Sequence, residues 1–402
     1  MRIFVWTLYD FANTSFSIIV VTFLFAIYFT ETIAEKSPAA DFYWSLGTSI
    51  SMLITACIAP VLGAIADYSA GKKRFLLVFT LLCIICTSLL YFTGAGDVKT
   101  ALILFILANI GFEAGLIFYD AFLSEITEAK NYGRVSGYGF AMGYFGSLTT
   151  LAIVFPFLQN DLIRETLPVS ALFFFIFAIP FFLFLKEKRV KRVPEKSYVK
   201  IGFERVFFTF KNLKNYRNLS MFLLSYFFFV EGINTVIYFS GIFAKKTLGF
   251  SNLELIVFFI TVQSTAILGS IIFGIYADSH GQKKTLMITL FVWVITIIFA
   301  FFVETKELFY GVGLLAGSAM GSSQSISRSL MAKLTPENKK TEFFGFYSFF
   351  GKSSAILGPL VFGVLSTITG SQRIAILSVL FFFAAGIFVL SKVNDKPDLS
   401  AE

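Results

Sequence analysis

Apolar residues occur along the chain in twelve long blocks that are separated by short polar stretches. Most blocks contain about 20 residues or more, the length that a helix needs to cross the hydrocarbon core of a bilayer. The pattern therefore predicts an all-α integral membrane protein with twelve transmembrane helices. The blocks cover roughly residues 4–29, 42–66, 75–94, 101–124, 135–158, 169–186, 219–243, 252–277, 285–303, 308–332, 344–368 and 373–391.

The longest polar break, residues 187–218, divides the blocks into two sets of six and is strongly basic. It predicts a cytoplasmic linker between an N-terminal six-helix bundle, residues 1–186, and a C-terminal six-helix bundle with a short cytoplasmic tail, residues 219–402. Within the break, residues 201–213 alternate Phe with Lys or Arg. This part fits either an amphipathic helix on an anionic membrane surface or a solvated linker.

Composition supports a membrane protein and the charges suggest its orientation. The 402 residues are 56% hydrophobic and 14% charged, whereas a soluble protein carries about 25% charged residues. Of the 33 Lys and Arg, 24 lie at the termini or in the loops on their side, and 7 lie in the opposite loops. Because basic residues favour the cytoplasmic side, we expect both termini in the cytoplasm. The membrane would be the cell (inner) membrane, or the vacuolar membrane in a eukaryote.

The two halves of the chain repeat each other in the same direction, which is typical of transporters with a site between two related bundles. Each half carries a glycine four residues before an aspartate, then a second glycine and a basic run. The aspartate is expected to accept hydrogen bonds from amides at the N-terminus of a neighbouring helix, where the helix dipole favours an anion. We interpret the two copies as a gating motif, formed by Gly63, Asp67, Gly71, Gly274, Asp278 and Gly281.

Charged and amide side chains interrupt several of the apolar blocks. A charge inside a membrane helix costs about 2.5–3.5 kcal/mol on insertion scales, so it usually faces a partner or a water-filled cavity. We therefore interpret these residues as candidate substrate contacts. They are Asp10, Asn13, Glu113, Asp120, Glu231, Asn234, Gln324, Arg328 and Lys352.

Structural explanations stay open for four of these candidates. Asp10 lies near the end of its block, so it fits a gating or helix-capping residue as well as a substrate contact. Asn13 and Asn234 also fit hydrogen bonds between helices. Lys352 also fits a side chain that reaches the headgroup region.

The acids among the candidates outnumber the bases, which has to be compensated in a medium of low dielectric constant. Asp120 and Arg328 are equivalent at the repeat offset of 208, which predicts an ion pair between the halves. Glu113 and Glu231 are candidates for proton coupling, because neither has a base on its own helix. A zwitterionic solute would also compensate the excess. An amino acid would place its ammonium group on Glu231 or Asp10 and its carboxylate on Arg328.

The paired motif, the basic central break and the six-plus-six layout resemble the major facilitator superfamily. Three stretches resemble one branch of it: Trp6-x-Leu-Tyr-Asp-Phe-Ala-Asn13, Ser323-Gln-Ser-Ile-Ser-Arg328-Ser-Leu, and Glu342-Phe-Phe-Gly-Phe-Tyr347 followed by Gly351-Lys352. This is the vacuole-effluxer-like branch, or unknown major facilitator family, which includes the autophagy-linked amino-acid effluxers of the fungal vacuole. The resemblance covers essentially the whole chain.

The resemblance implies the major facilitator fold and a secondary carrier that works by alternating access. It also implies a polar cavity lined by the first, fourth, seventh and tenth helices, and amino-acid export as one activity. We expect a monomer whose partners are a small-molecule substrate, a proton and the lipid bilayer, with no nucleic acid. One extra residue separates Asp67 from Gly71, so the first copy of the gating motif departs from the superfamily pattern.

The sequence does not favour an enzyme, and no cofactor or metal site is expected. The single histidine, His280, lies in a basic loop, and Cys83 and Cys86 form a CxxC inside an apolar block with no second pair. Among other polar and aromatic residues, Glu125 fits a solvated helix end, whereas Trp6 and Tyr9 fit interface anchors. A cation or metal carrier and a non-transporting receptor or scaffold are the alternative functions.

Overall fold

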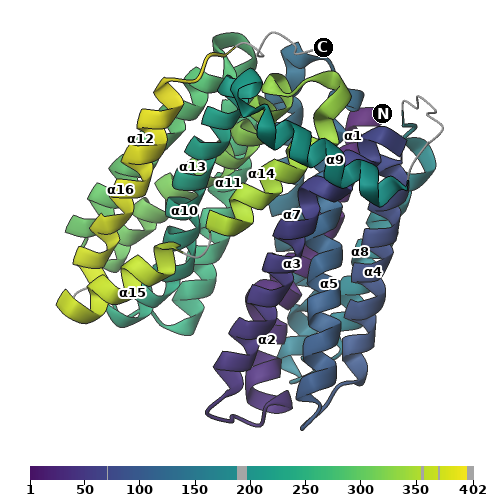
Figure 1. Cartoon of the computed structure of the whole chain (residues 1–402). Coiled ribbons are helices and arrows are strands. Elements are labelled where there is room, and N and C mark those ends of the chain that lie inside the picture. Colours follow the sequence, from purple (N-terminus) through teal and green to yellow (C-terminus); the bar gives the residue numbers. More distant parts are fainter. Residues whose placement is uncertain (70, 188–196, 355–356, 370–371, 396–402) are drawn as a thin grey trace. The chain divides into compact units, whose positions relative to one another are not determined.

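The computed structural model describes residues 1–69, 71–187, 197–354, 357–369 and 372–395. Within these ranges, the side chains of residues 213, 252, 357–360, 363, 367 and 372 are not described. All regular elements in this part of the chain are helices, as Figure 1 shows, and it contains no strand. The prediction of an all-α protein is confirmed.

Parts of the predicted linker and tail lie outside the described residues. The tail is described only as far as Asp395. The basic linker residues that lie outside are Lys188, Arg189, Lys191, Arg192 and Lys196.

The chain forms two compact units. The domain boundaries predicted from the sequence stay predictions. Unit 1 consists of Met1–Ile126, Met142–Val206 and Lys339–Gly345. Its complete elements are α1 (Arg2–Phe16), η1 (Ser17–Phe23), α2 (Leu24–Tyr28), η2 (Phe29–Ile33), α3 (Ala40–Ser69), α4 (Lys72–Leu89), η3 (Leu90–Phe92), α5 (Val98–Ala121), α6 (Leu123–Ile126) and α8 (Thr166–Phe184). In this unit α1 packs against α8, and α5 packs against both α3 and α4.

Unit 2 consists of Thr127–Ala141, Phe207–Asn338 and Phe346–Glu402. Its complete elements are η4 (Ala129–Asn131), η5 (Leu213–Tyr216), α10 (Arg217–Lys246), α11 (Asn252–His280), α12 (Gln282–Phe302), α13 (Lys306–Leu334), α15 (Leu357–Thr369) and α16 (Gln372–Ser391). Here α11 packs against α13, α10 against α16, and α12 against both α13 and α16.

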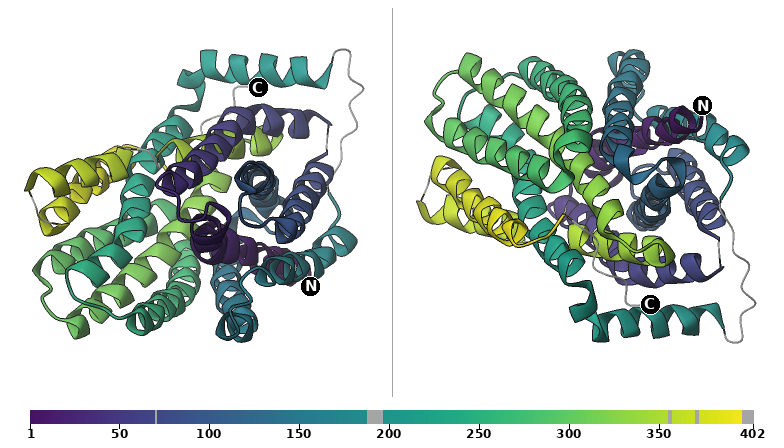
Figure 2. Two further views of the ribbon diagram at one scale, coloured as in Figure 1. Left: turned by 90° about the horizontal axis from the view of Figure 1, so that it is seen from below. Right: turned by 90° about the horizontal axis from the view of Figure 1, so that it is seen from above.

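Three helices begin in one unit and end in the other. The helix α7 (Tyr132–Gln159) belongs to unit 2 as far as Ala141 and to unit 1 from there on. The helix α14 (Lys340–Ser354) belongs to unit 1 as far as Gly345. The helix α9 (Tyr198–Lys211) belongs to unit 1 as far as Val206. In both views of Figure 2, α5, in blue, is seen along its axis, whereas α9, in teal, is seen from the side.

Glycines of α13 allow this helix to approach α11 to backbone distance in unit 2. A Cβ atom on Gly317 of α13 would lie 2.2 Å from the carbonyl oxygen of Val262 on α11. A Cβ on Gly321 would lie 2.1 Å from the carbonyl oxygen of Ala266. Small residues at such contacts are typical of helices that associate within membranes, where packing rather than hydrophobicity drives association.

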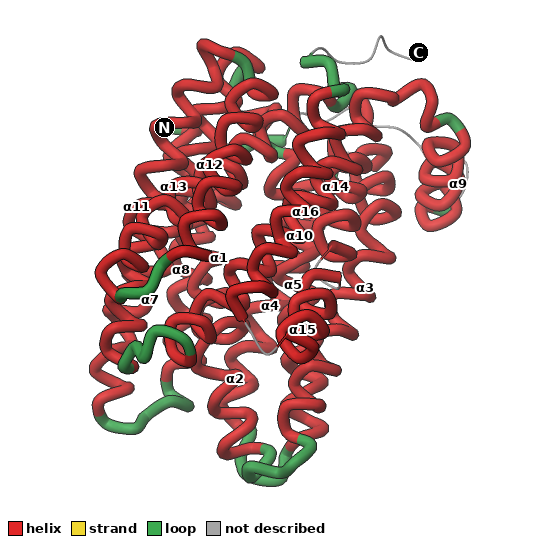
Figure 3. Tube along the Cα trace, turned by 90° about the vertical axis from the view of Figure 1, so that its left-hand side faces the viewer, coloured by secondary structure: helices red, strands yellow, loops and turns green. Residues whose placement is uncertain are grey.

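Ten helical segments in the described part of the chain are long and apolar enough to cross a membrane. Helices are joined by short loops, as the tube view in Figure 3 shows. The helix α13 is long enough but carries a serine-rich stretch with Arg328, and the predicted block 344–368 includes residues 355–356, which lie outside the described residues. The protein is therefore a multi-pass membrane protein, and the count of twelve spans is not confirmed.

Candidate functional site

Asp10 lies on α1 in a buried aromatic cluster of unit 1. Its side chain is 7% exposed, and the hydroxyl group of Tyr119 on α5 donates to its Oδ2 at 2.7 Å. The ring of Tyr119 stacks on Trp6 at 4.7 Å and on Tyr9 at 4.8 Å between centroids. The interpretation of Trp6 and Tyr9 as interface anchors is therefore wrong, because both rings are buried and hold the start of α1 against α5.

Close contacts fix the next turn of α1 against α7 and α8 within unit 1. Thr14 donates to the carbonyl oxygen of Gly143 at 2.9 Å, and Ser15 donates to that of Ser170 at 3.1 Å. A Cβ atom on Gly146 would lie only 2.2 Å from a backbone oxygen of α1. Packing at this distance leaves little freedom to the polar face of α1.

Asn13 is buried one turn from Asp10 on this face. It is 3% exposed, and its Nδ2 atom has no hydrogen-bond partner among the described residues. An unsatisfied buried donor costs about 1–3 kcal/mol, so such a group in a native protein calls for a water molecule or a ligand. Asn13 therefore offers a hydrogen-bond donor one turn from the carboxylate of Asp10. Both residues are among the substrate contacts predicted from the sequence.

Polar residues also occupy the middle of α5. Glu113 is buried and Asp120, two turns further along, is partly exposed. One turn before Glu113, the buried Asn109 donates from Nδ2 to Ser51 on α3 at 2.8 Å. Its Oδ1 has no hydrogen-bond partner in the described structure. Sequence reasoning missed Asn109, although an asparagine four residues before a buried glutamate shares its helix face.

In unit 2, Arg328 on α13 is held by the start of α7. The guanidinium group is 2% exposed. Its Nε donates to Ser136 Oγ at 2.9 Å and one Nη donates to the Ser136 carbonyl oxygen at 3.0 Å. It lies over the ring of Phe140 at 4.2 Å, a cation–π distance. Sequence reasoning missed Ser136 and Phe140, because nothing local in the sequence links α7 to α13.

The other candidates of unit 2 lie on three helices. Glu231 on α10 is fully buried, and Asn234, three residues later, is partly exposed. Gln324 lies one turn before Arg328 on α13, and Lys352 lies on α14, both partly exposed. The ion pair between Asp120 and Arg328 stays a prediction, because the two residues belong to different units.

Both aspartates of the gating motif accept hydrogen bonds at a helix N-terminus. Asp278 on α11 accepts from the backbone amides of Gly133 at 2.8 Å and Arg134 at 3.2 Å, at the start of α7. Arg134 Nε also donates to it at 2.6 Å. Asp67 on α3 accepts from the amides of Thr341 and Glu342, at the start of α14. The extra residue after Asp67 does not prevent the contact.

The four motif glycines lie at these same contacts or at the adjoining turns. A Cβ on Gly63 would lie 2.2 Å from the carbonyl oxygen of Thr341, and one on Gly274 would lie 2.7 Å from that of Gly133. Gly281 has a φ angle of +93°, a conformation that residues with a side chain rarely adopt. Gly71 precedes the first residue of α4.

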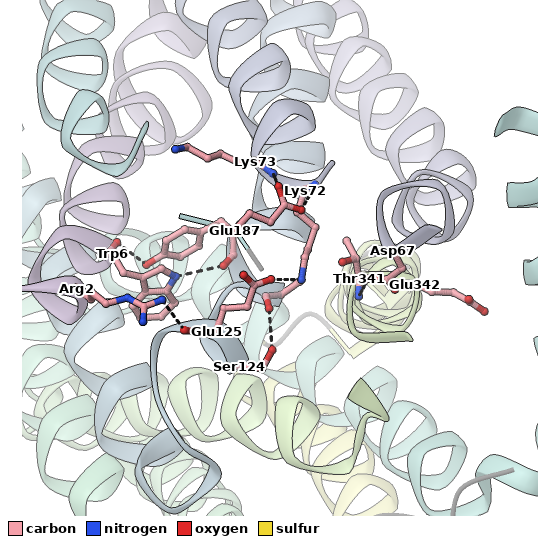
Figure 4. Close-up of polar contacts among 12 residues, drawn as sticks. Arg2, Trp6, Asp67, Lys72, Lys73, Ser124, Glu125, Glu187, Thr341 and Glu342 are labelled. Atoms are coloured by element: carbon pink, nitrogen blue, oxygen red, sulfur yellow. Dashed lines mark hydrogen bonds and ion pairs between the residues drawn. The ribbon is translucent and has the colours of Figure 1, made fainter. Parts of the chain in front are cut away.

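A second polar network of unit 1 surrounds the N-terminus of α4, as Figure 4 shows. Glu187 accepts from the backbone amides of Lys72 at 2.8 Å and Lys73 at 3.3 Å. The ammonium group of Lys72 forms an ion pair with Glu125, whose carbonyl oxygen accepts from Arg2 at 2.9 Å. The interpretation of Glu125 as a solvated helix end is wrong, because its side chain is buried.

Unit 2 has a related network with different charges. Lys333, which is equivalent to Glu125 at the offset of 208, pairs with Asp395 at 3.1 Å and donates to Gln282 at 2.9 Å. In unit 1 burial raises the pKa of Glu187, although the amides of Lys72 and Lys73 oppose the shift. The raised pKa places the titration of Glu187 above its usual value of 4.5.

The family model described as "Vacuole effluxer Atg22 like" matches residues 42–132 and 124–397. The chain belongs to the Atg22-like vacuole effluxer family. An uncharacterized MFS-type transporter of Bacillus subtilis, YxiO, is 34% identical over 97% of this chain and 94% of its own. Autophagy-related protein 22 of Yarrowia lipolytica is 24% identical over 70% of this chain and 54% of its own.

Solved structures show the same fold. The human organic anion transporter MFSD10 has a TM-score of 0.77 at 15% identity, over 96% of this chain and 98% of its own. The proton:xylose symporter XylE has a TM-score of 0.75 at 16% identity, over 99% of this chain and 97% of its own. This Atg22-like protein therefore has the major facilitator fold. The family model and the relative in Bacillus subtilis indicate a secondary transporter, and the family resemblance of the sequence is confirmed.

Proposed function

We propose that this Atg22-like protein is a proton-coupled carrier that exports small zwitterionic solutes of the amino-acid class by alternating access. The observation that carries the proposal is the pair of polar groups on α1. Asp10 supplies a buried carboxylate, and Asn13 supplies a buried amide donor with no partner among the described residues. An amino acid offers the complement of both, an ammonium group and a carboxylate that are attached to the same carbon atom.

Arg328 supports a zwitterionic rather than a purely cationic solute. A buried guanidinium group presents several donors that match a carboxylate in bidentate geometry. Ser136 and Phe140 hold this group in one orientation, which would reduce the entropy that a solute loses on binding. In this proposal Arg328 binds the solute carboxylate, and Asp10 or Glu231 binds its ammonium group.

Glu113 and Glu231 are our candidates for proton coupling. Both are buried in the membrane-spanning part of the chain, on α5 and α10. A carboxyl group inside a membrane span can carry a proton across the membrane if its access to water changes during the cycle. We propose that each does so once in the transport cycle.

The aspartates of the gating motif would control that access. Each carboxylate stabilises the N-terminus of one helix through two backbone amides and the helix dipole. Each contact includes hydrogen bonds to two backbone amides, and water can replace the carboxylate as their partner when the contact breaks. We propose that they are made in one state of the cycle and released in the other.

We place the protein in a bacterial cell membrane as a monomer with both termini in the cytoplasm. The excess of Lys and Arg on the side of the termini supports this orientation. The transporter of Bacillus subtilis that matches nearly the whole chain supports a bacterial membrane.

A binding screen followed by transport would test the proposal. The purified protein is heated in detergent with amino acids, organic cations, sugars or divalent metals at two pH values, because a ligand of the native state raises the melting temperature. We expect a hit among the amino acids that is lost in Asn13→Ala and Arg328→Gln but kept in the exposed control Asp41→Asn. Proteoliposomes should then exchange the same amino acid, faster with a pH gradient.

Other hits would change the conclusion. Stabilisation by metals alone, lost in Asp10→Asn and Glu231→Gln, would favour a cation or metal carrier. Binding that is indifferent to all four substitutions would reject this site. A folded protein that binds and exchanges none of these solutes would favour a receptor or scaffold.

A further inference from the structure

The helix α9 has three distinct faces. One face is buried against unit 1. A second face carries large exposed apolar side chains. The third face is polar and exposed. On a helical projection at 100° per residue the apolar face contains Val199, Phe203, Phe207 and Phe210, and the polar face contains Lys200, Glu204 and Lys211.

The buried face fixes how α9 is turned. Gly202 lies so close to α3 that a Cβ atom would come within 2.7 Å of Ile65 and 3.0 Å of Val61. Arg205, on the same face, donates to Glu342 Oε2 at 3.3 Å, and the Glu342 side chain is fully buried. Rotation of α9 about its axis would break both contacts. The apolar face therefore has to point away from unit 1.

The side chains of the apolar face are more exposed than most other large apolar side chains of the protein. Phe203 is 61% exposed and Phe207 is 72% exposed, with Val199 and Phe210 above half. Burial of apolar surface contributes a favourable free energy of about 25 cal/mol for each Å². Side chains that stay in water do not gain this contribution. The ring of Phe210 also packs edge to face against Phe346 of α14, with ring centroids 5.5 Å apart. The other three side chains form an exposed apolar row, which is typical of a face that has a partner.

The position of α9 in the chain identifies that partner. The helix follows the span α8, which ends at Phe184, and precedes the span α10, which begins at Arg217. It lies across the direction of α5, as Figure 2 shows. An amphipathic helix with Phe on one face and Lys on the next, between two spans, lies where headgroups meet acyl chains.

We propose that α9 is a membrane-surface helix that binds anionic phospholipids. Phe203, Phe207 and their neighbours enter the boundary between headgroups and acyl chains, while Lys200 and Lys211 bind the phosphate groups of anionic lipids. Basic residues at a membrane surface gain from anionic headgroups within a Debye length. This inference does not depend on the transported solute.

The same helix contacts the gating motif of unit 1. Arg205 binds the side chain of Glu342, whose backbone amide donates to Asp67 at 2.8 Å. Tyr198 at the start of α9 lies against Tyr68, with ring centroids 6.4 Å apart. Lipid that holds α9 in place therefore also stabilises the start of α14 at Asp67.

Brominated lipids test the insertion directly. A tryptophan is placed on the apolar face by Phe207→Trp. The matched control Phe208→Trp places it 100° further around the helix, beyond the polar face, at a position that is also exposed. The proteins are reconstituted in phosphatidylcholine with or without bromine on the acyl chains, and the signal of the native tryptophans is subtracted. We expect roughly twofold or greater quenching for Phe207→Trp and little for Phe208→Trp. Equal quenching, or none at position 207, would overturn the proposal.

Lipid charge is tested by nanodiscs of phosphatidylcholine alone or mixed with phosphatidylglycerol. We expect anionic lipid to raise the melting temperature of the native protein, and Lys200→Glu with Lys211→Glu to abolish that gain. The matched control is Lys245→Glu with Lys246→Glu at the far end of α10, which should keep it. An equal effect of both pairs would contradict specific binding by α9. A dimer in detergent that Phe207→Asp dissolves would assign the apolar face to a second copy instead.

Discussion

Asp67 and Glu342 are joined by a hydrogen bond of 2.8 Å from a backbone amide to a carboxylate, across 275 positions of sequence. Asp278 makes the same contact with Gly133 at the start of α7. In each case an acidic side chain satisfies amides that the first turn of a helix leaves without partners. The two copies of the gating motif thus perform the same structural task in their own units.

Removing either of these carboxylates should destabilise the protein. A side chain that caps a helix contributes about 1 kcal/mol, within a range of about 0.5–2 kcal/mol. We expect Asp67→Ala and Asp278→Ala each to lower the melting temperature in detergent by a few degrees. The control Glu304→Ala removes an exposed acid that lies between α12 and α13, outside both helices, and should change little. Equal losses in all three variants would contradict a specific role.

Gly137 should not tolerate a side chain. A Cβ at this position would lie 2.3 Å from the carbonyl oxygen of Ser270, and a backbone atom cannot move aside as a flexible side chain can. Overpacking of this kind typically costs about 1–3 kcal/mol, so Gly137→Ala should lower the melting temperature and the yield. The control is Gly241→Ala on α10, where the described structure has no atom within 4 Å. A normal Gly137→Ala protein would show that α7 and α11 are further apart.

Tyr119→Phe should weaken the cluster around Asp10. The substitution removes the hydroxyl group that donates to Asp10 at 2.7 Å and leaves the stacked rings in place. Loss of a donor to a buried charged group costs about 1–3 kcal/mol, measured as a lower melting temperature. Tyr43→Phe, on an exposed residue at the start of α3, is the matched control. If both variants melt like the native protein, the hydroxyl group does not stabilise Asp10.

Glu187 should make stability depend on pH. Its pKa is raised in the folded protein by burial, so the fold keeps a proton that the unfolded chain has already released. The contribution of Glu187 to stability therefore falls as pH rises from its usual pKa of 4.5 through the raised value. We expect the melting temperature of the native protein relative to Glu187→Gln to decrease over this range.

The control for this pH dependence is Glu128→Gln. Lys130 lowers the pKa of the exposed Glu128 through a hydrogen bond and its charge, so any contribution would have the opposite sign. Solvent screens such a surface pair, and its melting difference should hardly change with pH. A native-minus-variant difference for Glu187 that increased with pH would contradict the argument.

The predicted pair of Asp120 and Arg328 can be tested by exchanging its charges. Each single substitution would place two like charges in the predicted pair, which is unfavourable in a medium of low dielectric constant, so Asp120→Arg and Arg328→Asp should each abolish transport in proteoliposomes. The double variant should recover at least part of it. The control reverses the charges of the exposed pair Glu31 and Lys36, which lie 3.6 Å apart. Transport should stay unchanged in both single variants and in the double variant. A folded double variant without activity would argue against the pair.

The class of the protein and many of its candidate residues can be predicted from the amino-acid sequence alone. Apolar blocks of span length predict helices, because a bilayer leaves backbone groups no partners other than one another. Polar residues in those blocks stand out for the same reason, which is how Asp10, Glu113 and Arg328 were found. The repeat marked Asp67 and Asp278 before any contact was known.

Contacts between side chains that are far apart in the sequence follow from the way the helices pack in three dimensions. Ser136 and Phe140 support Arg328, and Glu187 caps α4, over separations of more than 100 residues. No local pattern encodes such contacts, since a serine or glutamate at a helix end looks the same with or without a distant partner. The structure also shows that Glu125, Trp6 and Tyr9 are buried, contrary to the interpretation from the sequence. A position near the end of a predicted helix does not tell which other helices cover the side chain.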